Sequence, residues 1–284
     1  MTMRKILTLS FLIFVIHTSI AQPSEKIINR YLLKYQLLPL SSSDTFIEPP
    51  LFGEIESIET TTNDTIRYQT IFKNNRLKSV ISTNTKSNYS YRFGRLSGIE
   101  FCSNDSIIAK TRKVGIFAFA WIFNHGLKYS ISYGLGNIKK IKSLTGMTTF
   151  SKTKIKYKKG RVQKTKNYGW QTVAQKCYYF GYNTYTYENE TKVVEKVFDA
   201  NDSLAFNKTY LFDSKGNILN IKTLIKKRAK GWGIDVTYYA YDGNIIETRK
   251  FDYKFDDKGN WLEKTEYLDD KLKNTTIRKI RYKN

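Results

Sequence analysis

The stretch of sequence that decides the fold is residues 253–267, which read Tyr-Lys-Phe-Asp-Asp-Lys-Gly-Asn-Trp-Leu-Glu-Lys-Thr-Glu-Tyr. It predicts a β-hairpin, because aromatic and β-branched residues that favour a pleated surface flank a short polar turn. Asp256 suits the first position of a type I turn, since its side chain accepts hydrogen bonds from nearby backbone N–H groups. Gly259 suits the left-handed position that closes the loop with a bulge. This geometry places Phe255 opposite Trp261 as a cross-strand pair.

The same phrase recurs along the chain. Clear copies stand at residues 210–218 and 239–245, and weaker ones at 89–96, 133–138 and 157–162. We therefore predict structural turns at Asp213, Gly216, Asp242, Gly243, Asp256 and Gly259. The turn glycines are irregularly spaced, which argues against a solenoid of fixed period.

A second turn sequence is also repeated. Asn-Asp followed by Thr or Ser occurs at residues 63–65, 104–106 and 201–203. Two recurring turns are what a meander needs if its strands reverse at both margins of a sheet. The predicted fold class is therefore all-β, an antiparallel meander of repeated hairpins in an open or curled sheet.

The phrases Asp-x-Lys-Gly-Asn and Asp-Gly-Asn resemble the YD (Rhs-type) repeats of secreted bacterial proteins, and in particular short, signal-bearing relatives that carry such phrases near their C-terminus. The similarity is clear over residues 198–270 and faint over 53–166. The resemblance implies a fold built from β-hairpins, and export from the cell. It supplies no active-site residues.

The N-terminus predicts an export signal at residues 1–21. Arg4 and Lys5 precede an apolar run at 6–16, and small residues follow up to Ala21, after which we expect cleavage. The run is too short to span a membrane comfortably, and no later segment reaches about 18 continuous apolar residues. We expect an exported chain, periplasmic or extracellular, without a transmembrane segment in its mature form.

Residues 22–50 predict one amphipathic helix and a linker, and residues 51–284 the β-hairpin repeat domain. Ser24 is the expected cap, and apolar residues recur at helical spacing to about Leu38, before Pro39. The first strands are expected at 54–61, 65–72, 77–82 and 88–93, and a fully buried strand at 114–123.

The chain is strongly basic, with 48 Lys and Arg against 25 Asp and Glu and a net charge of +23. Every second residue from 152 to 158 is lysine, so one face of that strand is cationic. The candidate polyanion-binding residues are Lys152, Lys154, Lys156, Lys158, Arg161, Lys164 and Lys166. The competing interpretation is a solvated lysine face that discourages aggregation between sheet edges. No nucleic-acid partner is expected, because an exported protein does not meet the nucleic acids inside the cell and the sequence contains no recognised nucleic-acid-binding module.

The sequence contains few of the residues and motifs that catalysis commonly uses. His125 is the single histidine outside the predicted signal, which disfavours histidine metal sites and Ser–His hydrolases. We therefore assign no catalytic residues, no metal ligands and no cofactor, and we expect that the protein is not an enzyme. Glu54 and Glu56 would lie on the same face of a strand. A solvent-exposed face is a simpler explanation of this spacing than a catalytic pair. Cys102 and Cys177 would form either a disulfide or two free thiols.

The leading functional hypothesis is an exported, non-enzymatic β-repeat protein of the bacterial envelope. Its lysine-rich sheet face would bind an anionic envelope polymer or glycan. One alternative is a carboxylate-based enzyme acting on glycans, which needs two acids facing each other in a concave site. Another is an assembly component that recruits a second chain by β-strand addition, most naturally through an unpaired edge at residues 276–282.

Overall fold

The structure is a computed structural model. It describes residues 23–33, 51–64, 66–74, 76–92, 95–103, 106–113, 118–123, 127–134, 137–145, 148–171, 176–225 and 245–283. The predicted signal at 1–21 and most of the predicted linker lie outside these residues, as do the predicted turn residues Asp242 and Gly243.

The described residues form one helix, α2 (Pro23–Leu32), and eighteen strands. The strands are β1 (Ile55–Thr62), β2 (Ile66–Lys73), β3 (Arg76–Ser82), β4 (Thr85–Arg92), β5 (Arg95–Ser103), β6 (Ser106–Lys113), β7 (Ala118–Phe123), β8 (Leu127–Gly134), β9 (Asn137–Thr145), β10 (Thr148–Lys158), β11 (Arg161–Gln171), β12 (Lys176–Tyr187), β13 (Lys192–Asp199), β14 (Leu204–Phe212), β15 (Ile218–Ile225), β16 (Ile245–Phe255), β17 (Trp261–Leu268) and β18 (Lys271–Tyr282).

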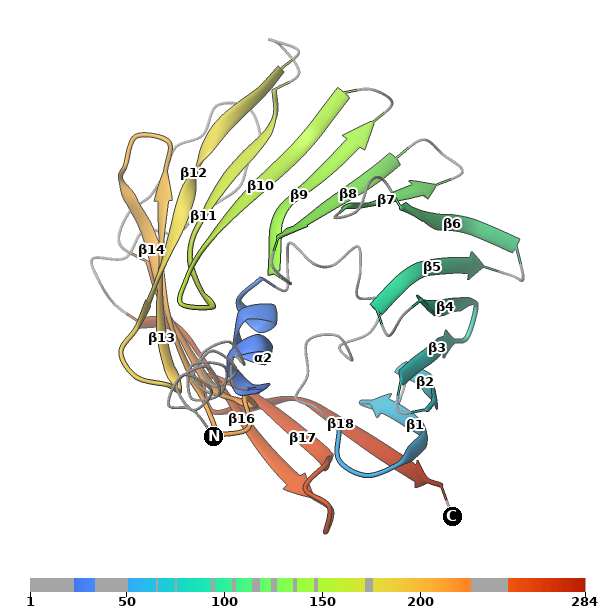
Figure 1. The fold of residues 1–284 in the computed structure, drawn as a ribbon. Helices are drawn as coiled ribbons and strands as arrows, with labels where there is room; N and C mark the ends of the chain where they lie inside the picture. The colour runs from blue at the N-terminus through green and yellow to red at the C-terminus, as the bar shows by residue number, and fades with distance from the viewer. Residues whose placement is uncertain are drawn as a thin grey trace, which may run out of the picture.

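The strands form a single antiparallel meander. Each strand pairs with its neighbours in the chain, and β1 pairs with β18 as well as with β2. The ladder of pairings therefore returns to the strand where it began, and Figure 1 shows the strands arranged around a ring. The predicted all-β meander with one N-terminal helix is confirmed. The right-handed twist between neighbouring strands accumulates over the meander and brings its first and last strands together.

The C-terminal strand is not the free edge that the sequence suggested. The segment at 276–282 lies in β18, between β17 and β1, with Ile280 opposite Ile58 and Arg278 opposite Thr60. The expectation of an unpaired edge there is wrong. A long strand with free backbone groups attracts a partner strand, and the first strand of the same chain supplies it.

The hairpin at residues 253–267 has the predicted geometry. Phe255 lies opposite Trp261 in the β16–β17 pair. The Asp256 carboxylate accepts hydrogen bonds from the backbone N–H groups of Lys258 (3.0 Å) and Asn260 (2.8 Å). Gly259 has a φ of 87°, in the left-handed region that favours glycine. The local sequence thus determines both the turn and the register of its strands.

The turn recurs with nearly the same hydrogen bonds. Asp213 accepts from the N–H groups of Lys215 (2.9 Å) and Asn217 (2.8 Å), and Gly216 has a φ of 88°. At the β13–β14 turn, Asp199 accepts hydrogen bonds from the N–H groups of Asn201 and Ser203, both at 2.9 Å. Asp202 takes the left-handed position there, with a φ of 60°. The Asp-x-Lys-Gly-Asn turn and this Asn-Asp-Ser turn therefore share one geometry.

The two turn sequences occupy opposite margins of the sheet, as the meander required. In an antiparallel meander, turns that follow even-numbered strands lie at one margin and those that follow odd-numbered strands at the other. The turns at 159–160, 213–217 and 256–260 follow β10, β14 and β16, whereas those at 63–64 and 199–203 follow β1 and β13. Strands β1 to β4 begin and end within three residues of their predicted bounds.

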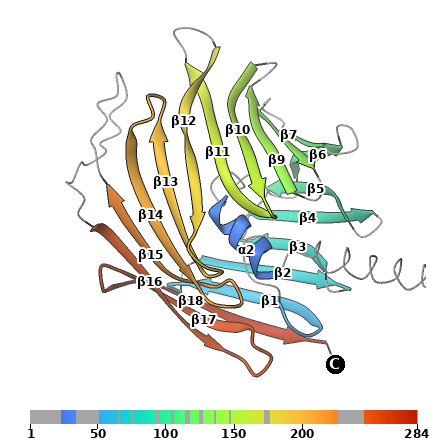
Figure 2. The same cartoon turned by 60° about the vertical axis from the view of Figure 1, so that its left-hand side comes forward.

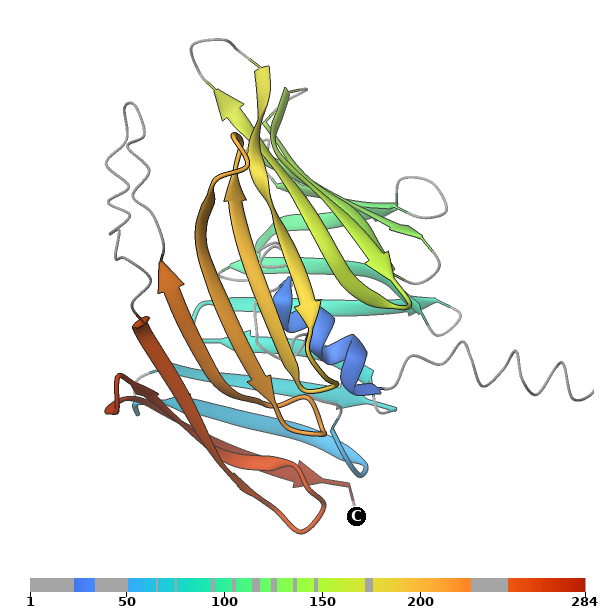
Figure 3. The same ribbon diagram turned by 90° about the vertical axis from the view of Figure 1, so that its left-hand side faces the viewer.

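Helix α2 lies inside the ring of strands (Figures 1, 2 and 3). Ile28, Leu32 and Leu33 are buried in one cluster with Val162 and Phe212, so these strand side chains point to the interior. Burying each large aliphatic side chain contributes about 1.5–3 kcal/mol. The helix is thus held by the same apolar stripe that predicted it.

The ends of α2 differ in part from the prediction. The helix begins at Pro23, so Ser24 lies in its first turn instead of capping it. Proline suits that position, because its fixed φ matches the helix and its missing N–H would have had no partner there. The predicted end near Leu38 lies outside the described residues.

Candidate functional site

The lysines of β10 and β11 point to the outside of the ring. Ile155 of β10 and Thr165 of β11 are buried in the interior, 7% and 0% exposed. Side chains alternate along a strand, so Lys154 and Lys156 on β10, and Lys166 on β11, lie on the outer face. Both strands therefore carry lysine outward and small or aliphatic side chains inward.

Strand register aligns these lysines in rows. Lys156 lies opposite Lys164, and Lys154 lies opposite Lys166. Strand β9 extends the rows, since Lys140 pairs with Lys154 and Lys142 with Lys152. The outer lysine face consists of Lys140, Lys142, Lys152, Lys154, Lys156, Lys164 and Lys166.

Two members of this face, Lys140 and Lys142, were absent from the sequence prediction. They flank Ile141, which is buried in the interior core. Lysine alternates with an apolar residue at 140–142, as lysine alternates with other residues at 152–158. The segment at 140–142 is shorter, and only the pairing of β9 with β10 shows that its lysines belong to the same surface.

The outer lysine face is electrostatically unbalanced. Like charges directly opposite each other on neighbouring strands repel. None of the seven lysines forms an ion pair with a residue that the structure describes. This part of the sheet therefore holds positive charge that no described side chain neutralises.

Aromatic rings border the face and hold some of its ammonium groups. The Lys152 ammonium lies 4.2 Å from the ring centroid of Tyr168, and that of Lys164 lies 3.5 Å from Tyr182. The Tyr182 ring also stacks on Phe198, with 4.8 Å between centroids. Each cation–π contact contributes about 0.5–1 kcal/mol at an exposed site. These contacts fix ammonium positions without cancelling their charge.

Lys158 and Arg161 lie beside the tight turn at the end of this face, and both line a pocket against α2. In β11, Gln163 is the extra residue of a bulge, because Lys156 lies opposite Lys164 while Tyr157 lies opposite Val162. Arg161 follows the tight turn and donates from Nε to Glu25 Oε1 of α2 at 2.6 Å. The structure thus divides the predicted set between the outer face and the site described next.

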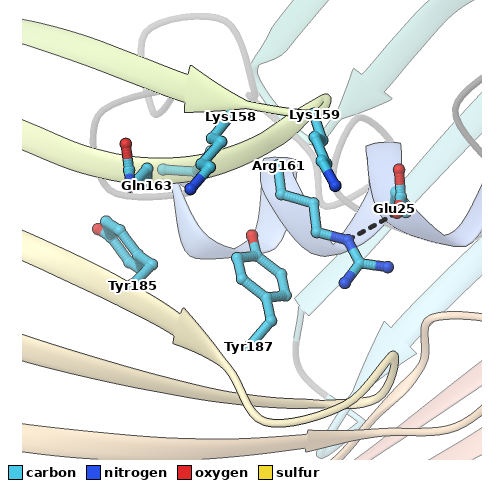
Figure 4. A pocket seen from close by; sticks show the side chains of 8 residues that line it. Glu25, Lys158, Lys159, Arg161, Gln163, Tyr185 and Tyr187 are labelled. Atoms are coloured by element: carbon cyan, nitrogen blue, oxygen red, sulfur yellow. Dashed lines mark hydrogen bonds and ion pairs between the residues drawn. The ribbon is translucent and has the colours of Figure 1, made fainter. Parts of the chain in front are cut away.

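The turn between β10 and β11 forms a pocket with the first turns of α2. Its volume is about 410 Å³, and its lining residues, drawn in Figure 4, are Glu25, Lys158, Lys159, Arg161, Val162, Gln163, Tyr185 and Tyr187. We call it the helix pocket. It holds three cationic side chains and a single carboxylate, and that carboxylate is already paired with Arg161.

Asn29 of α2 fixes the wall of the helix pocket. Its side chain donates to the Gly160 carbonyl at 2.7 Å and accepts from the Val162 N–H at 3.0 Å. The Tyr187 hydroxyl donates to the same amide oxygen at 3.1 Å. Burial raises the pKa of Tyr187 well above its usual value, although the nearby Arg161 guanidinium opposes that rise. Its hydroxyl therefore stays protonated and keeps this bond.

A polar chain crosses the interior beside the pocket. Asn167 donates to Asn183 at 3.1 Å, and Asn183 donates to the buried Glu195 carboxylate at 2.6 Å. Tyr210 donates to the other oxygen of Glu195, also at 2.6 Å. Burial, followed by the charge of Glu195, raises the pKa of Tyr210 and of Tyr185. The chain satisfies a carboxylate that apolar residues would otherwise isolate.

A carboxylate-based glycan enzyme needs two acidic side chains that face each other. The helix pocket has one acidic lining residue, Glu25, so it does not contain such a pair. Glu56 forms an ion pair with Arg281 at 3.0 Å, and Glu54 is exposed. Within the described ranges, no group of three or more His, Cys, Asp or Glu side chains is placed to hold a metal ion. Cys102 is half-buried and free.

No family model matches the chain, and no curated protein sequence matches it. Among solved structures, a porin-like protein from Bacteroides uniformis is similar at 12% identity and a TM-score of 0.44, over 82% of this chain and 98% of that one. A TcdB2–TccC3–Cdc42 structure is similar at 9% identity and a TM-score of 0.18, over 74% of this chain and 15% of that one.

Among the described residues, no helix combines the length and the apolar character that crossing a membrane would need.

Proposed function

We propose that this is an exported, non-enzymatic β-repeat protein of the bacterial envelope, and that its outer lysine face binds an anionic envelope polymer or glycan. The observation that carries the proposal is the alignment of seven lysines in register over β9, β10 and β11, without an ion pair to any described residue.

Polyanion binding accounts for a face that is unfavourable in the free protein. Rows of like charge across neighbouring strands cost stability, and a bound polyanion would convert that repulsion into attraction. A face of one sign also raises the local concentration of opposite charge and speeds association. The cation–π contacts of Lys152 and Lys164 support this role, because they hold two ammonium groups in place before binding.

Export and repeat type belong to the same proposal. The signal at 1–21 supports export, and the shared turn of Asp213 and Asp256 supports a YD-type hairpin repeat. An envelope location would place the lysine face next to anionic polymers, such as lipopolysaccharide or acidic glycans, rather than nucleic acid.

The test compares two triple variants of equal charge change. K154Q/K156Q/K166Q removes three exposed lysines from the outer lysine face. K78Q/K222Q/K279Q removes three exposed lysines from β3, β15 and β18. Binding to polygalacturonate and to lipopolysaccharide vesicles is measured from about 50 to 500 mM salt, a range over which screening of surface charge changes strongly.

We expect the first variant to lose at least about tenfold in affinity, roughly 0.5 kcal/mol for each lysine, and the second to lose far less. Wild-type affinity should fall steeply with salt. Equal losses in both variants would show that net charge alone drives binding, and salt-independent binding would exclude the proposed mechanism.

A further inference from the structure

We propose that the helix pocket is a second binding site, and that its ligand is a small acidic sugar, a hydroxylated ring carrying one carboxylate or phosphate group. The pocket lies between α2 and the β10–β11 turn, on the interior side of the sheet, away from the outer lysine face. The inference does not depend on polymer binding at that face.

The charges of the pocket specify an anion. Arg161 is paired with Glu25, whereas Lys158 and Lys159 form no ion pair with a described residue. Both lysines are exposed, so an anion reaches them from solvent. Two ammonium groups beside a guanidinium form a set of donors suited to one carboxylate or phosphate, and charge-assisted hydrogen bonds of this kind are about twice as strong as neutral ones.

The remaining lining specifies a ring with hydroxyl groups. Figure 4 shows Gln163 and Tyr185 on one side of the pocket and Arg161 with Glu25 on the other. The Gln163 amide offers both a donor and an acceptor. The Tyr185 hydroxyl is buried beside Glu195, so the ring of Tyr185 and not its hydroxyl lines the pocket. A ligand hydroxyl would bond to the Gln163 amide, while the rings of Tyr185 and Tyr187 provide apolar surface.

Size and rigidity favour a small ligand over a polymer. A volume of about 410 Å³ lies in the range of small-molecule sites, about 300–1,000 Å³. The three hydrogen bonds of Asn29 hold the helix wall against the turn before any ligand enters. A site formed in advance loses little conformational entropy on binding.

The experiment is isothermal titration of the full chain with four probes: glucuronate, glucose 6-phosphate, glucose and inorganic phosphate. We expect the two acidic sugars to bind, and glucose and inorganic phosphate to bind at least about tenfold more weakly, since each lacks one half of the recognised chemistry. Glucuronate and glucose 6-phosphate then show whether carboxylate or phosphate is preferred. Glucose or inorganic phosphate binding as well as the acidic sugars would overturn the proposal, as would a failure of both acidic sugars to bind.

Variants locate the binding. K158Q/K159Q should weaken glucuronate binding at least about tenfold, the loss of one charge-assisted hydrogen bond. The matched control K154Q/K156Q removes the same charge from the outer lysine face and should leave glucuronate binding unchanged. Gln163→Ala should weaken binding several-fold with an unchanged melting temperature, which separates a lost ligand contact from a lost fold. Binding that survives K158Q/K159Q, or that K154Q/K156Q abolishes, would place the ligand elsewhere and refute the assignment.

Discussion

The outer surfaces of β9–β11 and β16–β18 belong to one sheet but arrange their charges in opposite ways. On β9–β11, lysine faces lysine across neighbouring strands. On β16–β18 and the turn between β17 and β18, Lys254 pairs with Glu263 at 2.9 Å and Lys250 with Asp270 at 2.5 Å. The Asp270 carboxylate raises the pKa of Lys250, so that ammonium group is held in its charged form.

The difference shows that the fold does not require unpaired lysines. The same meander, with the same strand spacing, accommodates cross-strand ion pairs on β16–β18. Rows of lysine on β9–β11 are therefore a property of that segment's sequence, as expected of a surface kept for a partner. We refer to the two surfaces as the outer lysine face and the paired face.

The largest expected effect lies in the core beneath the paired face. Trp261 is 4% exposed, packs edge-on against Tyr253 with 6.3 Å between centroids, and lies 3.5 Å from the Arg278 guanidinium. Trp261→Ala should lower the free energy of unfolding by about 3–5 kcal/mol, because it leaves a cavity under the sheet. Chemical denaturation measures this value.

The matched change beside the outer lysine face is Tyr182→Ala. It should lower the free energy of unfolding by about 1–2 kcal/mol, because it removes one stacked pair and one cation–π contact at a half-buried site. Equal losses for Trp261→Ala and Tyr182→Ala would contradict the view that Trp261 belongs to the core and Tyr182 to the outer surface.

Acidification is expected to have the next largest effect, and it should destabilise β16–β18 more than β9–β11. Burial opposes ionisation of Asp256, but hydrogen bonds from Tyr282 and from the N–H groups of its turn outweigh burial and lower its pKa. Its folded-state pKa lies below the unfolded value, so its stabilising contribution is complete above about pH 4 and is lost as pH falls through the folded value.

We therefore expect acidification from pH 7 to pH 3 to destabilise β16–β18 by at most about 1 kcal/mol, and β9–β11 much less. Hydrogen exchange of peptides from 140–166 and 250–282, corrected for the intrinsic pH dependence, measures both regions in one sample. Asp256→Asn should remove part of the pH dependence in the second peptide. Uniform loss of protection would show that the regions unfold together.

Sequence reasoning predicted the turns well because each turn is determined within five residues. The Asp–Gly geometry at 213–217 and 256–260 depends on one carboxylate, one left-handed glycine and neighbouring N–H groups. Closure of the sheet depends instead on contacts between Ile58 and Ile280, which are far apart in the chain, and no local pattern encodes it.

The candidate site shows the same limit. Alternation correctly placed Lys154, Lys156 and Lys166 on one face, because periodicity is local. It did not predict that Arg161 pairs with Glu25, because that carboxylate belongs to a helix more than 120 residues earlier in the chain. The helix pocket has no sequence signal at all, since its lining is assembled from segments that only the fold brings together.

Charge reversal is expected to have a smaller effect and tests the comparison directly. Lys154→Glu places a carboxylate opposite both Lys140 and Lys166 and should stabilise the protein by about 0.5–1 kcal/mol. Glu263→Lys places two lysines side by side on the paired face and should destabilise it by a similar amount. Both are measured by thermal denaturation at low salt, with Lys154→Gln and Glu263→Gln as neutral controls. A destabilising Lys154→Glu would mean that the outer lysines do not repel one another in the free protein.

Salt should produce the smallest effect, with opposite signs on the two surfaces. Raising ionic strength from 0.01 to 0.5 M shortens the screening length from about 30 Å to less than 8 Å. Screening relieves repulsion on the outer lysine face and weakens the exposed ion pairs of the paired face, so each change is a few tenths of a kcal/mol. Local hydrogen exchange should slow in peptides from 140–166 and quicken in those from 250–282. If both regions respond with the same sign, salt acts on the whole fold, and lysine pairing across β9–β11 no longer distinguishes that surface from the rest of the sheet.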